Sequence, residues 1–278
     1  MSTAVVGIRL EAAMQAWALA ARGTHRDCYA RPTNSGVIGL VANALGRDFA
    51  DPIGDLAALR FGVRVDRPGQ LEIDYHTSGG GRHQALPREV VWSAGAGDPT
   101  DPAFLVYETV KNPTPGPGWN MKGGSGDTYV TIDRYLADAS FLAALEGPSA
   151  LIAQIGEALL SPARAVFLGR RAYGPATSLL EGVREASIEE LFADTVEEAA
   201  ERTGNAVFDA YVEPRHGARG NVISDQPVSF DGPIRRSARF ENQYTLTAAA
   251  AADRRDVGGP VASPDRDDVF DTAFAERN

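Results

Sequence analysis

A stretch rich in glycine and proline separates two sets of regular elements, and it limits the folds open to this chain. The regular apolar pattern breaks from about 74 to 134, where two strand-like pieces, "REVVW" and "FLVYETV", lie between irregular connectors. Residues 111 to 126 alone contain three prolines and five glycines. Connectors of this kind seldom form the core of a compact domain. We therefore predict a long hairpin inserted into a domain whose core elements lie on both sides of it.

The flanking residues predict alternating strands and helices. In chain order these are a strand at 4–10, a helix at 35–45, a strand at 59–66, a strand at 139–145, a helix at 148–160 and a last strand within 165–175. This order of strands and helices is the ferredoxin-like order, which RNA-recognition modules share. The expected fold class is α+β, a ferredoxin-like domain with an inserted β-hairpin thumb.

Beyond this domain, the sequence predicts an acidic amphipathic helix at 187–204. Ser187 and Glu190 have the spacing of a capping box, and Gly204 is a typical helix stop. Strands at 205–213 and 239–249 then indicate a smaller C-terminal β-rich extension.

Domain boundaries follow from these elements. We predict a body at 1–252, with the thumb at about 78–128 and the C-terminal β extension at about 205–249. The polar residues 253–278 are predicted to form a disordered tail.

The net charge of −10 at first argues against nucleic acid as a partner. However, residues 181–213 contribute −8 and residues 253–278 contribute −3, so the rest of the chain sums to +1. Its basic residues are 25 arginines and two lysines. A GC-rich genome explains this bias, and so does a need for the planar guanidinium, which suits phosphates and base edges.

Several ligand classes and locations are not expected. Cys28 is the only cysteine and the four histidines are scattered, so neither a disulfide nor a metal site is predicted, and no cofactor. The sequence contains no run of about 18 apolar residues and no signal-peptide pattern at its start, so we expect a reduced, cytoplasmic protein without a membrane partner.

The stretch "RPTNSGVIGLVANALG" (31–46) has the residues of a phosphate-binding helix start. Asn34 or Ser35 can cap the helix, Arg31 adds a full positive charge, and Gly36 permits close approach of a backbone. The alternative is an ordinary capped core helix whose small residues pack on the sheet. Local features leave both interpretations open.

Other candidates stand in short polar or aromatic groups. Gln15 can bind a base edge, while Trp17 offers either a stacking face or a core side chain. Arg22, His25 and Arg26 follow in a loop that meets either phosphates or solvent.

Two arginine pairs come later in the chain. Arg170 and Arg171 follow a glycine turn at a predicted strand end, so their side chains are expected on opposite faces. Tyr173 can stack on a base, and "RRSAR" adds Arg235 and Arg236.

Five blocks occur in a characteristic order: "IRLEAAMQAW", "RPTNSGVIGLVANALG", "DYHT" (74–77), "RYLADASFLAAL" (134–145) and "FLGRRAYGP" (167–175). With "QPVSF" and "RRSARF", they resemble the CasD family, the subtype I-E members of the fifth Cas protein family. These proteins are subunits of the CRISPR surveillance complex Cascade. The resemblance spans about residues 4–247.

The resemblance implies a non-enzymatic subunit that binds the 5′ handle of CRISPR RNA. Its partners would be the large subunit and the last backbone subunit, with target DNA met only through the complex. The residues expected to contact RNA are Gln15, Arg22, Arg26, Arg31, Asn34, Ser35, Gly36, Tyr75, His76, Arg82, Lys111, Lys122, Arg170, Arg171, Tyr173, Arg235 and Arg236.

Two other function classes remain in view. Tyr75 and His76 could serve a metal-independent ribonuclease, which needs a general acid or base, although no lysine stands near them in the sequence. A generic acidic scaffold would instead have dispersed arginines. The acidic helix is expected either to present a solvated face or to steer a neighbouring subunit.

Overall fold

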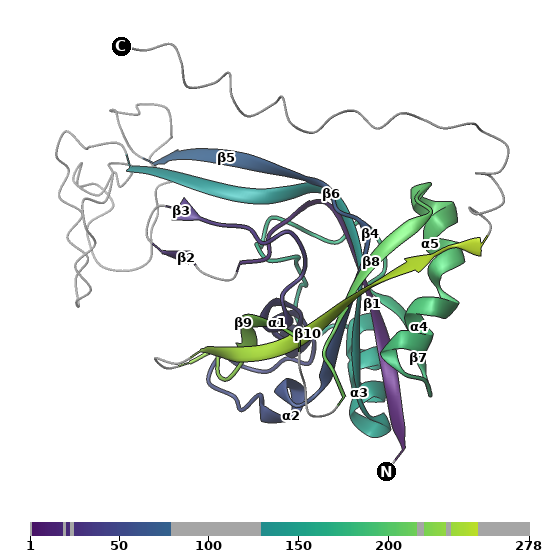
Figure 1. Ribbon diagram of the computed structural model, residues 1–278. Helices are drawn as coiled ribbons and strands as arrows, with labels where there is room; N and C mark the ends of the chain where they lie inside the picture. The colour runs from purple at the N-terminus through teal and green to yellow at the C-terminus, as the bar shows by residue number, and fades with distance from the viewer. Residues whose placement is uncertain are drawn as a thin grey trace, which may run out of the picture.

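A large, mainly antiparallel sheet organises the computed structural model, which describes residues 2–18, 21–22, 25–78, 129–215, 220–231 and 235–249 (Figure 1). The strands are β1 (Thr3–Gln15), β2 (Ala21–Arg22), β3 (His25–Arg26), β4 (Arg60–Arg67), β5 (Gln70–Ser78), β6 (Tyr129–Pro148), β7 (Leu180–Arg184), β8 (Val207–Val212), β9 (Asn221–Pro227) and β10 (Arg236–Thr247). The helices are α1 (Asn34–Ala44), α2 (Gly54–Ala57), α3 (Ser149–Leu160), α4 (Ile188–Asp194) and α5 (Val196–Thr203). None of these helices is long and apolar enough to cross a membrane.

Four strands form the centre of the sheet, in the order β7-β1-β6-β4, and each is antiparallel to its neighbour. Helix α1 precedes β4, and α3 connects β6 to β7. These elements confirm the predicted strands at 4–10 and 59–66 and both predicted helices. The strand predicted at 139–145 is the inner part of the much longer β6.

The central strands are buried on both faces, which explains their nearly continuous apolar sequence. On one face, Ile8 of β1 and Phe141 of β6 pack with the residues of α1 and α3. On the other face, Val5 and Leu142 pack against Phe192 of α4. Since burying one large aliphatic or aromatic side chain stabilises a fold by about 1.5–3 kcal/mol, these two cores hold the scaffold rigid.

The outer half of β6 leaves the central sheet and pairs with β5, from Gln70 opposite Ala137 to Ser78 opposite Tyr129 (Figure 1). The turn before β5 depends on Gly69, which has a φ of 71°, and a Cβ there would lie 2.5 Å from the Ala137 carbonyl oxygen. Regular structure thus continues beyond residue 74, where the sequence pattern breaks. The predicted thumb, apart from its first residue, lies outside the residues that the structure describes.

The segment 165–175 is not a strand, so that prediction is wrong. It forms turns, and the amide of Leu168 donates to the carbonyl oxygen of Tyr173 over 2.7 Å. Gly169 has a φ of 95°, and a Cβ there would lie 1.8 Å from the carbonyl oxygen of Ala16. The last central strand is instead β7, which the sequence reasoning missed.

The predicted acidic helix at 187–204 is two helices, α4 and α5, which meet at Thr195. Its predicted ends are confirmed: Ser187 and Glu190 form the capping box, and Gly204 has left-handed geometry. At the junction, the Thr195 hydroxyl donates to the Leu191 carbonyl and accepts from the buried guanidinium of Arg64.

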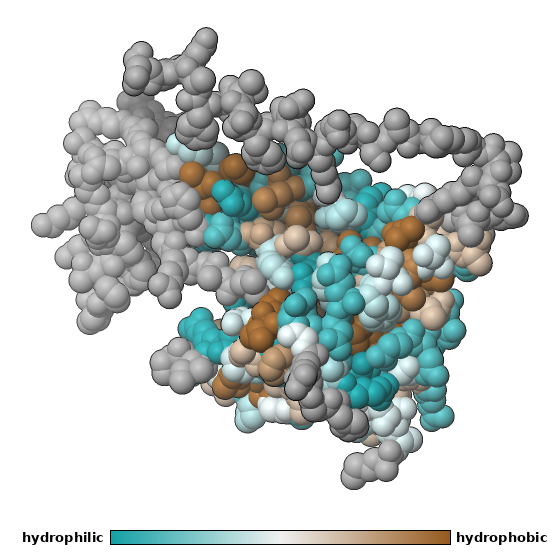
Figure 2. Space-filling view, in the orientation of Figure 1, coloured by the Kyte–Doolittle hydropathy of each residue, from teal (hydrophilic) through white to brown (hydrophobic). Residues whose placement is uncertain are grey.

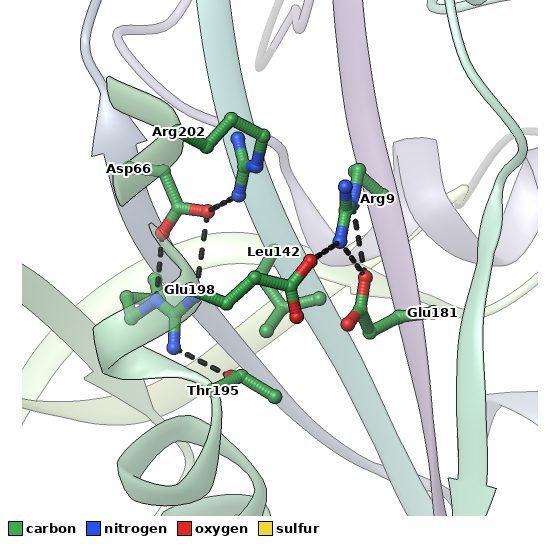
Figure 3. Close-up of a pocket in the computed structure, with 8 residues that line it drawn as sticks. Arg9, Asp66, Leu142, Glu181, Thr195, Glu198 and Arg202 are labelled. Carbon is green, nitrogen blue, oxygen red and sulfur yellow. Dashed lines mark hydrogen bonds and ion pairs between the residues drawn. The ribbon is translucent and has the colours of Figure 1, made fainter. Parts of the chain in front are cut away.

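The acids on these helices do not simply face solvent. Glu198 of α5 accepts a hydrogen bond from Arg9 of β1, which also pairs with Glu181 (Figure 3). Beside them, Asp66 lies between Arg64 and Arg202. Arg9 lowers the pKa of Glu198, as an ion pair should. Part of the acidic surface of α4 and α5 is therefore engaged in ion pairs that attach these helices to the sheet.

The C-terminal strands extend the sheet past β4, in the order β4-β8-β10-β9. They confirm the predicted strands at 205–213 and 239–249, while β9 was not predicted. The β9–β10 hairpin reaches α1 (Figure 1). The predicted tail at 253–278 lies outside the described part of the chain.

Candidate nucleic-acid interface

The start of α1 is buried and already holds an anion from the protein itself. Thr33, not Asn34 or Ser35, caps the helix by accepting the amide of Gly36 over 3.3 Å. The amide of Asn34 donates to the Asp225 carboxylate over 2.7 Å. A carboxylate therefore occupies the positive end of the helix, where the sequence predicts a phosphate, and Asn34 and Ser35 are buried. Their contact with RNA stays a prediction.

Arg31 is likewise turned inward. Its side chain pairs with Glu241, and its guanidinium carbon lies 3.8 Å from the centre of the Tyr211 ring and 4.7 Å from that of Tyr29. Only 9% of the residue is exposed. The charge of Arg31 is therefore engaged within the protein, and its contact with RNA stays a prediction.

A chain of buried charges continues from Arg31 into the β9–β10 hairpin. Arg239 donates to Asp225 over 2.6 Å and to Glu241 over 3.1 Å. The blocks "RPTNSG", "QPVSF" and "RRSARF" thus lie together, since Asn34 also donates to Gln226 over 2.8 Å. We define Arg31, Asp225, Arg239 and Glu241 as the α1 charge network. Its evident role is to hold the hairpin on α1.

Gln15, Trp17 and Gly36 also belong to the core. The Gln15 amide donates to the carbonyls of Leu10 and Ala139 and accepts from the Trp17 indole, so it has no unpaired group to offer a base. A Cβ on Gly36 would lie 2.9 Å from the Trp17 ring. The polar groups of Gln15 are thus engaged within the protein, and Gly36 permits close contact with Trp17. Contact of these two residues with RNA stays a prediction.

The outer half of β6 brings other candidates together. At Ile132, β6 pairs with Tyr75 of β5 on one edge and with His25 of β3 on the other. One residue along, Asp133 pairs with Arg26 in the same way. Residues from separate sequence blocks therefore lie on adjacent strands, and we call β5, the outer half of β6 and β3 the outer sheet.

Asp133 is a buried carboxylate shared by two arginines. Nη1 of Arg26 and Nη1 of Arg170 each lie 3.6 Å from the same Asp133 oxygen, while its other oxygen has no hydrogen-bond partner. Arg170 also donates to the Tyr173 hydroxyl over 2.9 Å and to the Arg134 carbonyl over 3.0 Å. Two arginines thus share Asp133, and Asp74 of β5 stands opposite it in the strand pairing.

Tyr173 contacts this cluster through its hydroxyl, which accepts from Arg170, and it does not offer a stacking face. It is buried, and its ring centre lies 6.0 Å from that of Tyr135. Burial also raises the pKa of the Tyr173 hydroxyl. The protein therefore covers the Tyr173 ring in this structure, and stacking of Tyr173 on a base stays a prediction.

Arg171 is the exposed member of its pair, on the turn after Gly169. Within the described ranges, no hydrogen bond or ion pair engages its side chain. The two arginines therefore differ in their surroundings, but they lie on a turn and not on the two faces of the predicted strand.

The outer sheet also has an apolar face. Leu71, Ile73 and Tyr75 alternate along β5 and are 53%, 59% and 61% exposed. Figure 2 shows apolar residues gathered over β5 and β6. Exposed apolar side chains in a row are typical of a binding surface, and Tyr75 is available for stacking.

A second exposed basic group stands at the start of β10. Arg235 lies with its guanidinium carbon 5.5 Å from the ring centre of Phe49, and Arg236 follows it on the surface. Burial around the guanidinium lowers the pKa of Arg236. Both side chains remain accessible to a ligand.

The remaining candidates are only partly placed. The backbone of Arg22 lies in β2 and that of His76 in β5. Arg82, Lys111 and Lys122 fall outside the described residues. In the ranges that the structure covers, no three acidic, histidine or cysteine side chains are grouped so as to hold a metal ion.

Sequence reasoning missed Leu71, Ile73 and Asp133. The signal for β5 was present, because "LEIDYHT" alternates apolar and polar residues from Leu71 to Tyr75. The role of Asp133 had no such signal, since it depends on arginines from two other segments.

Comparisons with known proteins agree on a family. A family model described as "CRISPR-associated protein (Cas_Cas5)" matches residues 5–241. A solved chain from a "CRISPR RNA-guided surveillance complex" has 32% identity and a TM-score of 0.59, over 89% of this chain and 92% of that one. A "Crystal structure of Cas protein" has 28% identity and a TM-score of 0.57, over 87% and 95%. No curated protein sequence matches.

Proposed function

The chain belongs to the Cas5 family of CRISPR-associated proteins, and we propose that it is the non-catalytic, crRNA-handle-binding subunit of a type I-E surveillance complex. In this role it holds the 5′ handle of CRISPR RNA, contacts the large and backbone subunits, and meets target DNA only through the complex. The similarity to a chain from an RNA-guided surveillance complex supports this assignment.

One observation carries the proposal: cationic and aromatic groups are concentrated on the outer sheet. Arg26 and Arg170 share one carboxylate, and Arg171 has no partner among the described residues. Tyr75 is exposed on the other face of the same strands, since it pairs with Ile132, the residue before Asp133. A single RNA strand offers phosphates to the arginines and flat bases to the tyrosine.

The two arginines of the turn have different roles in this proposal. Arg170 is a positioning residue, because its hydrogen bonds to Tyr173 and the Arg134 carbonyl fix the turn. Arg171 contacts a phosphate directly. Arg235 and Arg236 extend the same function from the β9–β10 hairpin.

The chain order of β1, α1, β4, β6, α3 and β7 supports the finer fold assignment, a ferredoxin-like body. In this assignment, β5 and the outer half of β6 lead into the thumb predicted at about 78–128. The expected location is the cytoplasm, where CRISPR RNA is found.

The experiment that tests this function measures the affinity of the purified full chain for a repeat-derived RNA at several salt concentrations. Arg171→Ala should weaken binding and reduce the salt slope by about 0.7, the value for one phosphate contact on a single strand. The matched control is Arg184→Ala on β7, an arginine that pairs with Asp194 away from the outer sheet. Equal slopes for the wild type and Arg171→Ala would overturn the assignment of Arg171.

A denaturing gel of the same mixtures tests the non-catalytic role. We expect intact RNA after long incubation. Specific cleavage that disappears in His76→Ala would replace this proposal with a ribonuclease.

A further inference from the structure

The apolar side chains of β5 form an open row on one face of the outer sheet (Figure 2). Leu71, Ile73 and Tyr75 are each more than half exposed. They share a face because side chains alternate across a strand. We call these three residues the β5 row. An exposed apolar row of this kind is typical of a docking surface.

An exposed cation stands beside the row on the same face. Arg134 of β6 lies opposite Ile73 in the antiparallel pairing, and residues paired in this way project to the same face. Nη1 of Arg134 lies 3.5 Å from an Asp27 carboxylate, and the two side chains are 47% and 73% exposed. So exposed a salt bridge contributes little, and Arg134 can exchange Asp27 for another carboxylate. The face therefore suits a ligand that is both apolar and acidic.

The segment 250–278 begins close to the start of β5. The amide of Ala248 donates to the carbonyl of Ala206 over 3.0 Å. The neighbouring Asn205 donates through its side chain to the carbonyl of Asp66 over 2.8 Å. Asp66 lies at the end of β4, just before the turn into β5. Two hydrogen bonds thus connect the beginning of the segment with the base of the β5 row.

The sequence of this segment has the complementary chemistry. Its two aromatic residues, Phe270 and Phe274, stand four positions apart. Positions four apart lie on the same side of a helix and of a strand. The residues around them, 267–274, include three aspartates and no basic residue. Two aromatic side chains on one side, with carboxylates beside them, match the β5 row and Arg134.

We propose that Phe270 and Phe274 dock on the β5 row of the same chain, with one of the adjacent aspartates pairing with Arg134. The docked segment covers Tyr75, so RNA has to displace it before a base can stack there. The docking is independent of the RNA-binding proposal, whereas the competition with RNA rests on it.

The covalent connection favours this occupant over a separate molecule. Twenty residues, 250–269, separate Ala249 from Phe270. An extended chain of that length reaches up to about 66 Å, which is ample for a segment that begins beside the base of β5. A tethered ligand also has an effective concentration of about the millimolar range, so a few weak apolar contacts suffice.

The first test records the backbone amide NMR signals of Leu71, Ile73 and Tyr75 in the full chain, without RNA. The double variant Phe270→Ser/Phe274→Ser should move these signals away from their wild-type positions, because its segment no longer docks. The matched control is Val257→Ser/Val261→Ser, which removes two apolar side chains from the same segment and should leave the signals unchanged.

A synthetic peptide of residues 265–278 then supplies the segment in trans. Added to the double variant, it should return the three signals toward their wild-type positions in a saturable titration. Ile73→Ser should weaken peptide binding about tenfold, and Arg134→Gln should weaken it about twofold to fivefold. Val222→Ser, at an exposed apolar position on β9, is the control and should bind the peptide normally.

Three results would overturn the docking: wild-type signals in the double variant, unchanged peptide binding by Ile73→Ser, or shifts that map elsewhere. Signals that change with protein concentration would instead show that the segment docks on a second copy of the chain, which contradicts the intramolecular assignment.

Competition is measured by titrating repeat-derived RNA into the wild type and the double variant. The double variant should bind RNA about threefold to tenfold more tightly, because no fraction of the chain is covered. Equal affinities would overturn the competition. A chain that binds no RNA refutes the function proposed above but not the docking, since the NMR test contains no RNA.

Discussion

The α1 charge network and the outer sheet contain the same kinds of residue but use them in opposite ways. In the network, Arg31 and Arg239 meet two carboxylates, Asp225 and Glu241, and all four residues are buried. In the outer sheet, Arg26 and Arg170 share one carboxylate, and Arg171 is exposed. The first arrangement joins elements of the fold, while in the second Arg171 has no partner among the described residues.

The difference teaches that an arginine motif in the sequence does not by itself provide a free charge, because the folded chain can supply the opposing carboxylates. "RPTNSG" resembles a phosphate-binding motif as closely as "FLGRRAYGP" does, but a carboxylate from β9 occupies its helix end. The two motifs are distinguished by the carboxylates that the folded chain places against each of them.

The largest effect is expected from a substitution that breaks the α1 charge network. Arg239→Ala leaves Asp225 and Glu241 buried with less compensation, and we expect a loss of about 3–5 kcal/mol in the free energy of unfolding. Urea unfolding measures it, with Arg184→Ala as a control that changes stability by less than about 0.5 kcal/mol. A loss of RNA affinity in the folded fraction, with no loss of stability, would contradict the division between the two regions.

Next in size is a change to the turn that presents Arg171. Gly169→Ala forces a Cβ against the Ala16 carbonyl at a φ of 95°, and we expect a cost of about 1–3 kcal/mol together with weaker RNA binding. Thermal unfolding and RNA titration measure the two effects. Gly174→Ala is the matched control, since a Cβ there meets nothing within 4 Å. Wild-type RNA affinity in Gly169→Ala would mean that the turn does not position Arg171.

A smaller effect is expected in the outer sheet, where removal of a carboxylate should strengthen RNA binding. Asp133→Asn removes the shared carboxylate, so Arg26 and Arg170 become available to RNA. We expect about threefold to tenfold tighter binding at low salt, and the gain should shrink as salt screens the charges. Asp138→Asn, an exposed position on the same strand, is the control. If Asp133→Asn weakens binding, the carboxylate orients the arginines more than it competes with RNA.

The smallest effect concerns Glu213, whose carboxylate forms no ion pair with another described residue. Its folded-state pKa lies above the usual value because of burial, so the ionised form destabilises the fold at neutral pH. Glu213→Gln should therefore raise stability by about 0.5 kcal/mol at pH 7. This gain should fade as pH falls through the raised pKa and vanish below the ordinary glutamate range. Thermal unfolding between pH 3.5 and 8 measures it, and a gain that does not depend on pH would exclude the carboxylate as its source.

The sequence by itself determined the elements whose signals are local. Apolar periodicity located β1, α1, β4 and α3, and the spacing of Ser187, Glu190 and Gly204 located the ends of the acidic helices. Such signals suffice because strand alternation and helix capping involve residues within a few positions of one another. The sequence blocks also identified the family, which the family model confirms.

Only the tertiary structure decided which arginines are free. Arg31 meets Glu241 across 210 positions of the chain, and Asn34 meets Asp225 across 191. The same dependence on folding brings Arg26, Asp133 and Arg170 together at the outer sheet. Coulomb and hydrogen-bond energies depend on distance in space and on burial, and neither quantity is a property of a residue's neighbours in sequence. A basic motif therefore acquires its role only when the fold supplies, or withholds, the opposing carboxylate.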